Sequence, residues 1–337
     1  MHEPYYICAQ PATFYYAWQV DAMLLSFEKL GGVNLSKVHI VCSEPVNDRF
    51  LKVKEKWSTK GVVFAFYKDE RKDIKYISSV RPHLLEKHWL KNPWLRNEDI
   101  FYHDCDIALT RPLKLRDKLT HNLGRMCYVS NTISYIGAEY IEGKGHNLLQ
   151  DMCDIVDIPI DLVREREDGS GGAQYLLKKG IDASFWRTVY RDSENLFHEI
   201  TRKCNKIASE NKEWHPLQIW CADMWAVLWN LWKKGYNTDC HEDLNFSWGT
   251  SRMKVWEECA IFHNAGVTKP SSPKKDGNTP FYKGIYINNS PLESLRPSEA
   301  WASQKYFDLV TQSFKDTDNI GKPIKKRIGK QIKKKFV

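Results

Sequence analysis

The sequence predicts an α/β fold in which one twisted, mostly parallel sheet is flanked by helices. Two observations support this fold class. Short β-rich runs alternate with helical patterns over the first third of the chain, as βαβ units require. The chain has 337 residues, of which 42% are hydrophobic and 13% aromatic, so it can bury a substantial core. We expect a single compact domain with two abutting halves.

The individual elements follow from this alternation and from the turn and cap residues between the runs. The expected strands lie at 5–9, 38–42, 62–67, 99–102, 126–130 and just before His263. The expected helices lie at 17–30, 48–57, 79–90, 146–156, 216–234 and 298–314, and another helical pattern begins near 173–179 after a loop at 165–172.

Composition excludes several classes of protein. No window has the roughly twenty apolar residues of a membrane span, and the first ten residues show no secretory leader. We therefore expect a cytoplasmic protein. Nine cysteines without Cys-x-x-Cys pairs indicate thiols in the core. The formal net charge of +8 is concentrated in the basic segment 322–337, which could contact an anionic membrane surface, and no motif that reads nucleic-acid bases accompanies it.

Two carboxylates at alternate positions, Asp104 and Asp106, directly follow the apolar and aromatic run at 99–102. Open α/β sheets bind ligands beyond the carboxyl ends of their strands. Such a pair of carboxylates can hold one divalent cation, Mn²⁺ or Mg²⁺, which also binds diphosphate oxygens. The sequence therefore predicts a metal and nucleotide site here. The alternative is an ordinary turn at a strand end.

His263 ends a second apolar run, and we expect it to be the third metal ligand, although a buried histidine held by hydrogen bonds would show the same pattern. Other residues are candidates for binding the nucleotide-sugar donor. Ala9 and Gln10 end the first strand, and Arg81 could meet the diphosphate. The run Gly171, Gly172, Ala173, Gln174 could bring the backbone close to a sugar or phosphate, with Gln174 bonding to sugar hydroxyls, or could be a flexible turn.

Asp223 lies among tryptophans in the expected helix 216–234. An acid among aromatic rings should have a raised pKa, which suits a general base, although a surface acid is the alternative. Sugars stack on aromatic rings, so Trp220, Trp225 and His215 could line an acceptor site, or the tryptophans could simply be core residues.

With these residues in place, the chain resembles the GT-A superfamily of glycosyltransferases, which have a Rossmann-like sheet. The resemblance rests on Phe101-Tyr102-His103-Asp104-Cys105-Asp106 and on Ile261-Phe262-His263-Asn264-Ala265-Gly266, and it spans roughly residues 5–290. Gly171-Gly172-Ala173-Gln174 and Asp223-Met224-Trp225 are similar to plant peptidyl hydroxyproline arabinosyltransferases and serine galactosyltransferases. This similarity implies a UDP-sugar donor. Apart from it, we expect a glycan or glycoprotein as the acceptor.

The sequence pattern changes after Pro112. We therefore expect a nucleotide-sugar-binding half at 1–113, an acceptor-binding half with the late metal ligand at 114–316, and a basic tail at 317–337. Two other functions are compatible with the same motifs. A metal-dependent nucleotidyltransferase or phosphohydrolase would need further carboxylates for a second metal. An inactive module that binds nucleic acid or a membrane surface would depend on residues 322–337.

Overall fold

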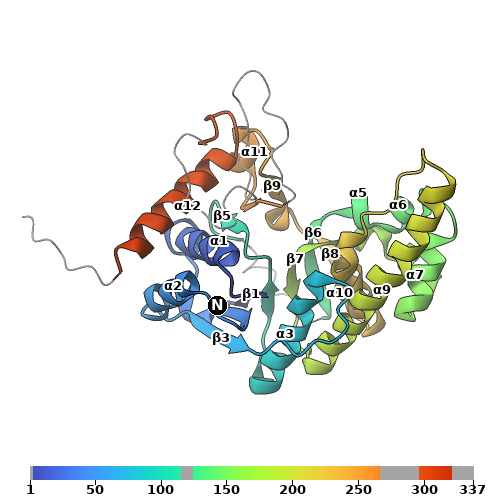
Figure 1. Cartoon of the computed structure of the whole chain (residues 1–337), viewed down its shortest axis with the longest axis horizontal. Coiled ribbons are helices and arrows are strands. Elements are labelled where there is room, and N and C mark those ends of the chain that lie inside the picture. The colour runs from blue at the N-terminus through green and yellow to red at the C-terminus, as the bar shows by residue number, and fades with distance from the viewer. Residues whose placement is uncertain (1–2, 115–123, 266–295, 321–337) are drawn as a thin grey trace, which may run out of the picture.

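The computed structural model describes residues 3–114, 124–265 and 296–320. Its centre is a seven-stranded sheet in the order β3-β2-β1-β4-β7-β6-β8 (Figure 1). Every neighbouring pair is parallel except the two that involve β7, which runs antiparallel to β4 and β6. This topology confirms the predicted α/β class. The strands are β1 (Tyr5–Pro11), β2 (Val38–Ser43), β3 (Val63–Tyr67), β4 (Ile100–Tyr102), β6 (Met126–Asn131), β7 (Gly171–Leu177) and β8 (Asn237–Cys240).

Helices cover this sheet in two groups (Figure 1). One core packs α1 and α2 against β1 and β2, while the other packs α3, α9 and α10 around β4, β6 and β7. The helices in these two groups are α1 (Phe14–Ser26), α2 (Asp48–Ser58), α3 (Val80–Lys91), α9 (Ala183–Glu210) and α10 (Ala222–Lys233). Around them lie α5 (Ile133–Ile136), α6 (Ala138–Glu142), α7 (Leu148–Val156), α8 (Ile160–Glu165), α11 (Met253–Glu258) and α12 (Ser303–Asp318).

A second, three-stranded sheet connects distant parts of the chain. It has the order β5-β10-β9, with β5 at Ile107–Leu109, β9 at Phe246–Trp248 and β10 at Ile261–His263. Strand β10 runs antiparallel to β5, and its residue His263 is paired with Ile107. This register places the end of β10 beside the turn that precedes β5.

The prediction of a helical pattern near 173–179 is wrong, because these residues lie in β7 and the chain just after it. The glycines that suggested a loop allow close strand packing instead. A Cβ atom added at Gly171 would lie 2.2 Å from the carbonyl oxygen of Ser130 in the neighbouring strand. The helix expected at 216–234 begins only at Ala222, after a 3-10 turn at Ile219–Cys221.

Other expected features have mixed outcomes. None of the nine cysteines forms a disulfide, and most of them are buried. In the described ranges, no helix is both long enough and apolar enough to cross a bilayer. Gly266 and the basic segment 322–337 lie outside the described residues. The division near residue 113 stays a prediction, although strands from both sides of it share the central sheet.

Candidate metal and nucleotide site

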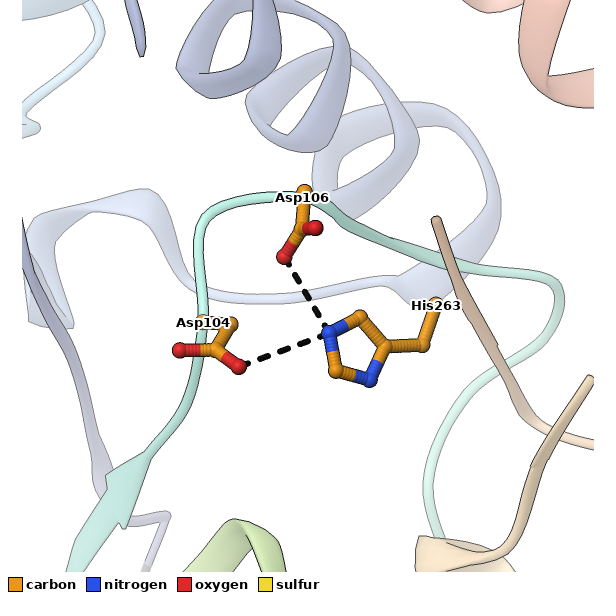
Figure 2. A group of neighbouring side chains, drawn as sticks. All are labelled: Asp104, Asp106 and His263. Atoms are coloured by element: carbon orange, nitrogen blue, oxygen red, sulfur yellow. Dashed lines mark ion pairs between the residues drawn. The ribbon is translucent and has the colours of Figure 1, made fainter. Parts of the chain in front are cut away.

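Two chain segments far apart in the sequence form the candidate metal site (Figure 2). Asp104 and Asp106 lie on the short turn between β4 and β5, and His263 is the last residue of β10. The pairing of β10 with β5 fixes the histidine opposite the residue that follows Asp106. The strand ends therefore position all three side chains, as predicted from the sequence.

The three side chains converge on one point. His263 Nε2 lies 3.4 Å from Asp104 Oδ2 and 3.2 Å from Asp106 Oδ1. One possible ligand atom from each residue lies within 4.8 Å of the others, and this is the one such group among the described residues. Two carboxylate oxygens and an imidazole nitrogen are suitable ligands for Mn²⁺. Mg²⁺ prefers oxygen ligands, which the two carboxylates supply. The donor set therefore fits the predicted divalent cation.

Electrostatics also indicate a place for a cation. Burial by itself lowers the pKa of His263, but the carboxylates of Asp106 and Asp104 outweigh burial and raise this pKa to about 9. Burial likewise opposes ionisation of Asp104, whereas Arg81 and His263 favour it, and the pKa of Asp104 lies below its usual value. The site therefore stabilises the ionised form of Asp104, and its carboxylates stabilise a positive charge placed between them.

Arg81 connects the metal site to Asp223. Its guanidinium donates hydrogen bonds to Asp104 Oδ1 and to Asp223 Oδ2. Arg81 lies at the start of α3 and Asp223 in the first turn of α10. Tyr76 Oη donates to Asp223 Oδ1 over 2.7 Å. Burial raises the pKa of Asp223, and Arg81 and Tyr76 oppose that rise.

A cavity of about 670 Å³ opens beside these residues. Its volume lies in the range of ligand sites. The wall includes the candidate metal ligands Asp104, Asp106 and His263. It also includes the candidate donor-binding residues Ala9, Gln10 and Arg81 and the candidate base Asp223. The parallel pairing of β1 with β4 brings Ala9 and Gln10 close to Asp104 and Asp106, because both strands end at the same edge of the sheet.

Other expected residues lie elsewhere. Gln174 is fully buried and does not line the cavity; its amide contacts His263 instead. Gly171 and Gly172 are also absent from the cavity wall, although neighbouring Ala173 is part of it. The role of these residues in donor binding therefore gains no support from their position.

The expected acceptor residues separate into two kinds. Trp220 lines the cavity and is 54% exposed. Trp225 is a core residue whose indole nitrogen donates to Ile136 O. His215 is exposed and does not line the cavity. Trp220 alone of the three is placed to contact an acceptor.

Sequence reasoning missed several tyrosines of the cavity region, including Tyr76 and Tyr175. Tyr76 donates a hydrogen bond to Asp223, and Tyr175 lines the wall with a buried hydroxyl that has no hydrogen-bond partner among the described residues. Tyr175 lies in β7, in the run expected to be helical, so its direction could not be deduced. Tyr76 lies in the segment between β3 and α3, where no periodic pattern indicated its orientation.

Comparison with known proteins gives only distant similarities. No family model matches the chain, and no curated protein matches it. Among solved structures, it is similar to the galactosyltransferase LgtC in complex with donor and acceptor sugar analogues, with 12% identity, a TM-score of 0.41, and coverage of 91% of this chain and 95% of that one. It is also similar to the bifunctional glycosyltransferase WbbM, with 8% identity, a TM-score of 0.44, and coverage of 92% and 52%.

Mouse xyloside xylosyltransferase 1 is a further match, with 9% identity, a TM-score of 0.35, and coverage of 79% of this chain and 99% of that one. All three matched proteins are named as glycosyltransferases, the class that the sequence motifs resemble. Since every TM-score is below 0.5, we take the function of this chain from the geometry of its own site.

Proposed function

We propose that this chain is a metal-dependent glycosyltransferase that moves a sugar from a nucleotide-sugar, with a UDP-sugar as the expected donor, to a hydroxyl group of a glycan or glycoprotein. The observation that carries the proposal is the convergence of Asp104, Asp106 and His263 on the wall of a cavity at the carboxyl ends of parallel strands. A cation held there stabilises the negative charge that develops on the diphosphate of a sugar nucleotide.

Asp104, Asp106 and His263 would hold Mn²⁺ or Mg²⁺, which stabilises the negative charge that grows on the leaving diphosphate. Arg81 supplies a second positive charge on the same wall and binds the diphosphate. Ala9 and Gln10, at the end of β1, contact the nucleoside.

Asp223 has a role that depends on stereochemistry. If the reaction inverts the anomeric carbon, its carboxylate accepts the proton of the acceptor hydroxyl while that oxygen attacks. If the configuration is retained, Asp223 binds the acceptor. In both cases Trp220, exposed on the cavity wall, offers an aromatic face to the acceptor.

The nucleotidyltransferase alternative is less well supported. A second metal would need further carboxylates, and the one candidate ligand group in the described ranges has only two. Asp69 and Asp223 also line the cavity, but neither belongs to that ligand group. We further propose that residues 322–337 bind an anionic membrane surface and that the protein is cytoplasmic. We expect no specific nucleic-acid partner.

The experiment is a thermal-shift and hydrolysis screen of UDP-, GDP- and dTDP-sugars with and without Mn²⁺. A ligand that binds only the folded chain raises Tm by mass action, so one sugar nucleotide should raise Tm in the presence of Mn²⁺. Asp106→Asn should abolish this shift and the metal-stimulated hydrolysis. Asp161→Asn, at a side chain that is 93% exposed, is the control and should leave both unchanged.

Two results would contradict the proposal. The first is a chain that shows no Mn²⁺-dependent shift with any donor. The second is an Asp106→Asn variant that keeps full metal-stimulated turnover.

A further inference from the structure

We propose that Gln174 is a positioning residue of the metal site, in which its side-chain oxygen accepts a hydrogen bond from His263 Nδ1–H and so presents His263 Nε2 to the cation. This inference rests on the metal site of the proposed function. It assigns Gln174 a role different from the sugar contact expected from the sequence.

The first evidence is the position of the Gln174 amide. It lies on the far side of the His263 ring from the carboxylates, with Nε2 of Gln174 3.3 Å from His263 Nδ1. The other ring nitrogen, Nε2, faces Asp104 and Asp106. Gln174 is fully buried, so water does not compete for this contact. The histidine is therefore held between its candidate metal site and a single buried amide.

The second evidence is a chemical requirement of the metal. A cation bound at Nε2 uses the lone pair of that nitrogen, so the ring proton must be on Nδ1. Nδ1–H then needs an acceptor, and metal-binding histidines nearly always have one. Within the described residues, the side-chain amide of Gln174 lies at hydrogen-bond distance from this nitrogen.

The third evidence concerns which end of the amide faces the ring. With Gln174 Nε2 toward His263, Gln174 Oε1 is buried and has no hydrogen-bond partner in the part of the chain that the structure describes. The oxygen and nitrogen of a glutamine amide exchange places by a half turn about the last side-chain bond. That turn makes Oε1 the acceptor that Nδ1–H requires.

The backbone shows how this residue comes to face the histidine. In the ladder between β6 and β7, Val129 pairs with Tyr175 and Asn131 pairs with Gly171, so one residue of β6 lies opposite three of β7. Ala173, within this bulge, has a φ of 75°, a conformation that favours glycine. Bulges are frequent beside active sites, where they redirect a side chain. Here the redirected segment includes Gln174.

Two variants test the inference. Gln174→Glu keeps an acceptor opposite Nδ1, and Gln174→Met removes it while keeping a side chain of similar length. The readout is the Mn²⁺ dissociation constant of the full chain, measured by titration calorimetry and by the EPR signal of unbound Mn²⁺, without any sugar nucleotide. Gln174→Met should weaken Mn²⁺ binding about 10- to 100-fold, the range for loss of such a supporting partner. Gln174→Glu should bind Mn²⁺ at least as tightly as the unaltered chain.

The outcomes separate this inference from the metal site itself. Unaltered affinity in Gln174→Met would overturn the role of Gln174 and leave the metal site intact. A Gln174→Glu variant as weak as Gln174→Met would also overturn it, because a merely structural glutamine would not be rescued by an acceptor. If the unaltered chain binds no Mn²⁺, the proposed metal site and this inference both fail.

Discussion

A buried pair of histidines should make the folded chain sensitive to acid. His39 on β2 and His88 on α3 are 4% and 1% exposed, and His39 Nδ1 lies 2.9 Å from His88 Nε2. Tyr67 Oη lies 2.9 Å from His88 Nδ1. These distances fit two neutral rings, in which Tyr67 Oη donates to His88 Nδ1 and His88 Nε2–H donates to His39 Nδ1.

The expected loss of stability follows from the pKa values. Burial lowers the pKa of His39 to about 4, and burial together with the charge of His39 lowers the pKa of His88 to about 3. In the unfolded chain both rings titrate near 6.5. As the pH falls below about 6.5, protons therefore bind the unfolded chain first, so this stability is complete above about pH 6.5 and declines down to about pH 3. For His39 alone the loss is about 3 kcal/mol.

Urea denaturation between pH 7 and pH 4.5 measures this loss as a free energy of unfolding. His88→Gln should be less stable than the unaltered chain at pH 7. Its stability should also fall less steeply as the pH is lowered, and the two slopes should differ by about 1.4 kcal/mol per pH unit, the value for one proton. His198→Gln is the control, because the side chain of His198 is 49% exposed. Parallel pH profiles for His88→Gln and the unaltered chain would refute the reasoning.

Three further predictions concern the cavity and the strand beside it. Arg81→Met leaves Asp223 buried without its cation, so we expect the unfolding free energy to fall by about 3 kcal/mol. Adding Asp223→Asn should recover part of this loss, and strictly additive losses would contradict the ion pair. Trp220→Ala should raise the acceptor KM about tenfold while the donor Kd stays unchanged, and an unchanged acceptor KM would exclude stacking. Gly171→Ala should lower Tm by several degrees because its Cβ would lie 2.2 Å from Ser130 O, and an unchanged Tm would show that the strands can separate at no cost.

The sequence predicted the first half of the fold well because local signals there agree with tertiary structure. Each expected strand before Asp104 is present within a few residues, since βαβ units alternate short apolar runs with helices. The later half contains the failures. The 28-residue helix α9 was missed, although its buried residues Phe185, Val189, Leu196 and Ile200 recur at helical spacing. The error at β7 arose because glycines that permit close strand packing look the same in sequence as those of a loop.

The candidate site was predicted in part for the same reason. Asp104 and Asp106 follow one apolar run and His263 ends another, and strand ends are visible in a sequence. The contacts between segments were not visible. The position of Gln174 behind His263 depends on a bulge in β7, and the bond from Arg81 to Asp223 depends on how α3 and α10 pack.

The charges of the cavity wall suggest why Arg81 bridges two acids. Asp104 faces two cationic groups, the guanidinium of Arg81 and the imidazole of His263, while Asp223 faces Arg81 alone. A divalent cation bound between Asp104 and His263 would bring two more positive charges close to Arg81, and like charges repel. In the proposed reaction, the guanidinium would then be better placed opposite the diphosphate of the donor than opposite Asp104. Because the same guanidinium also binds Asp223, its movement toward the donor would leave that carboxylate available to the acceptor hydroxyl.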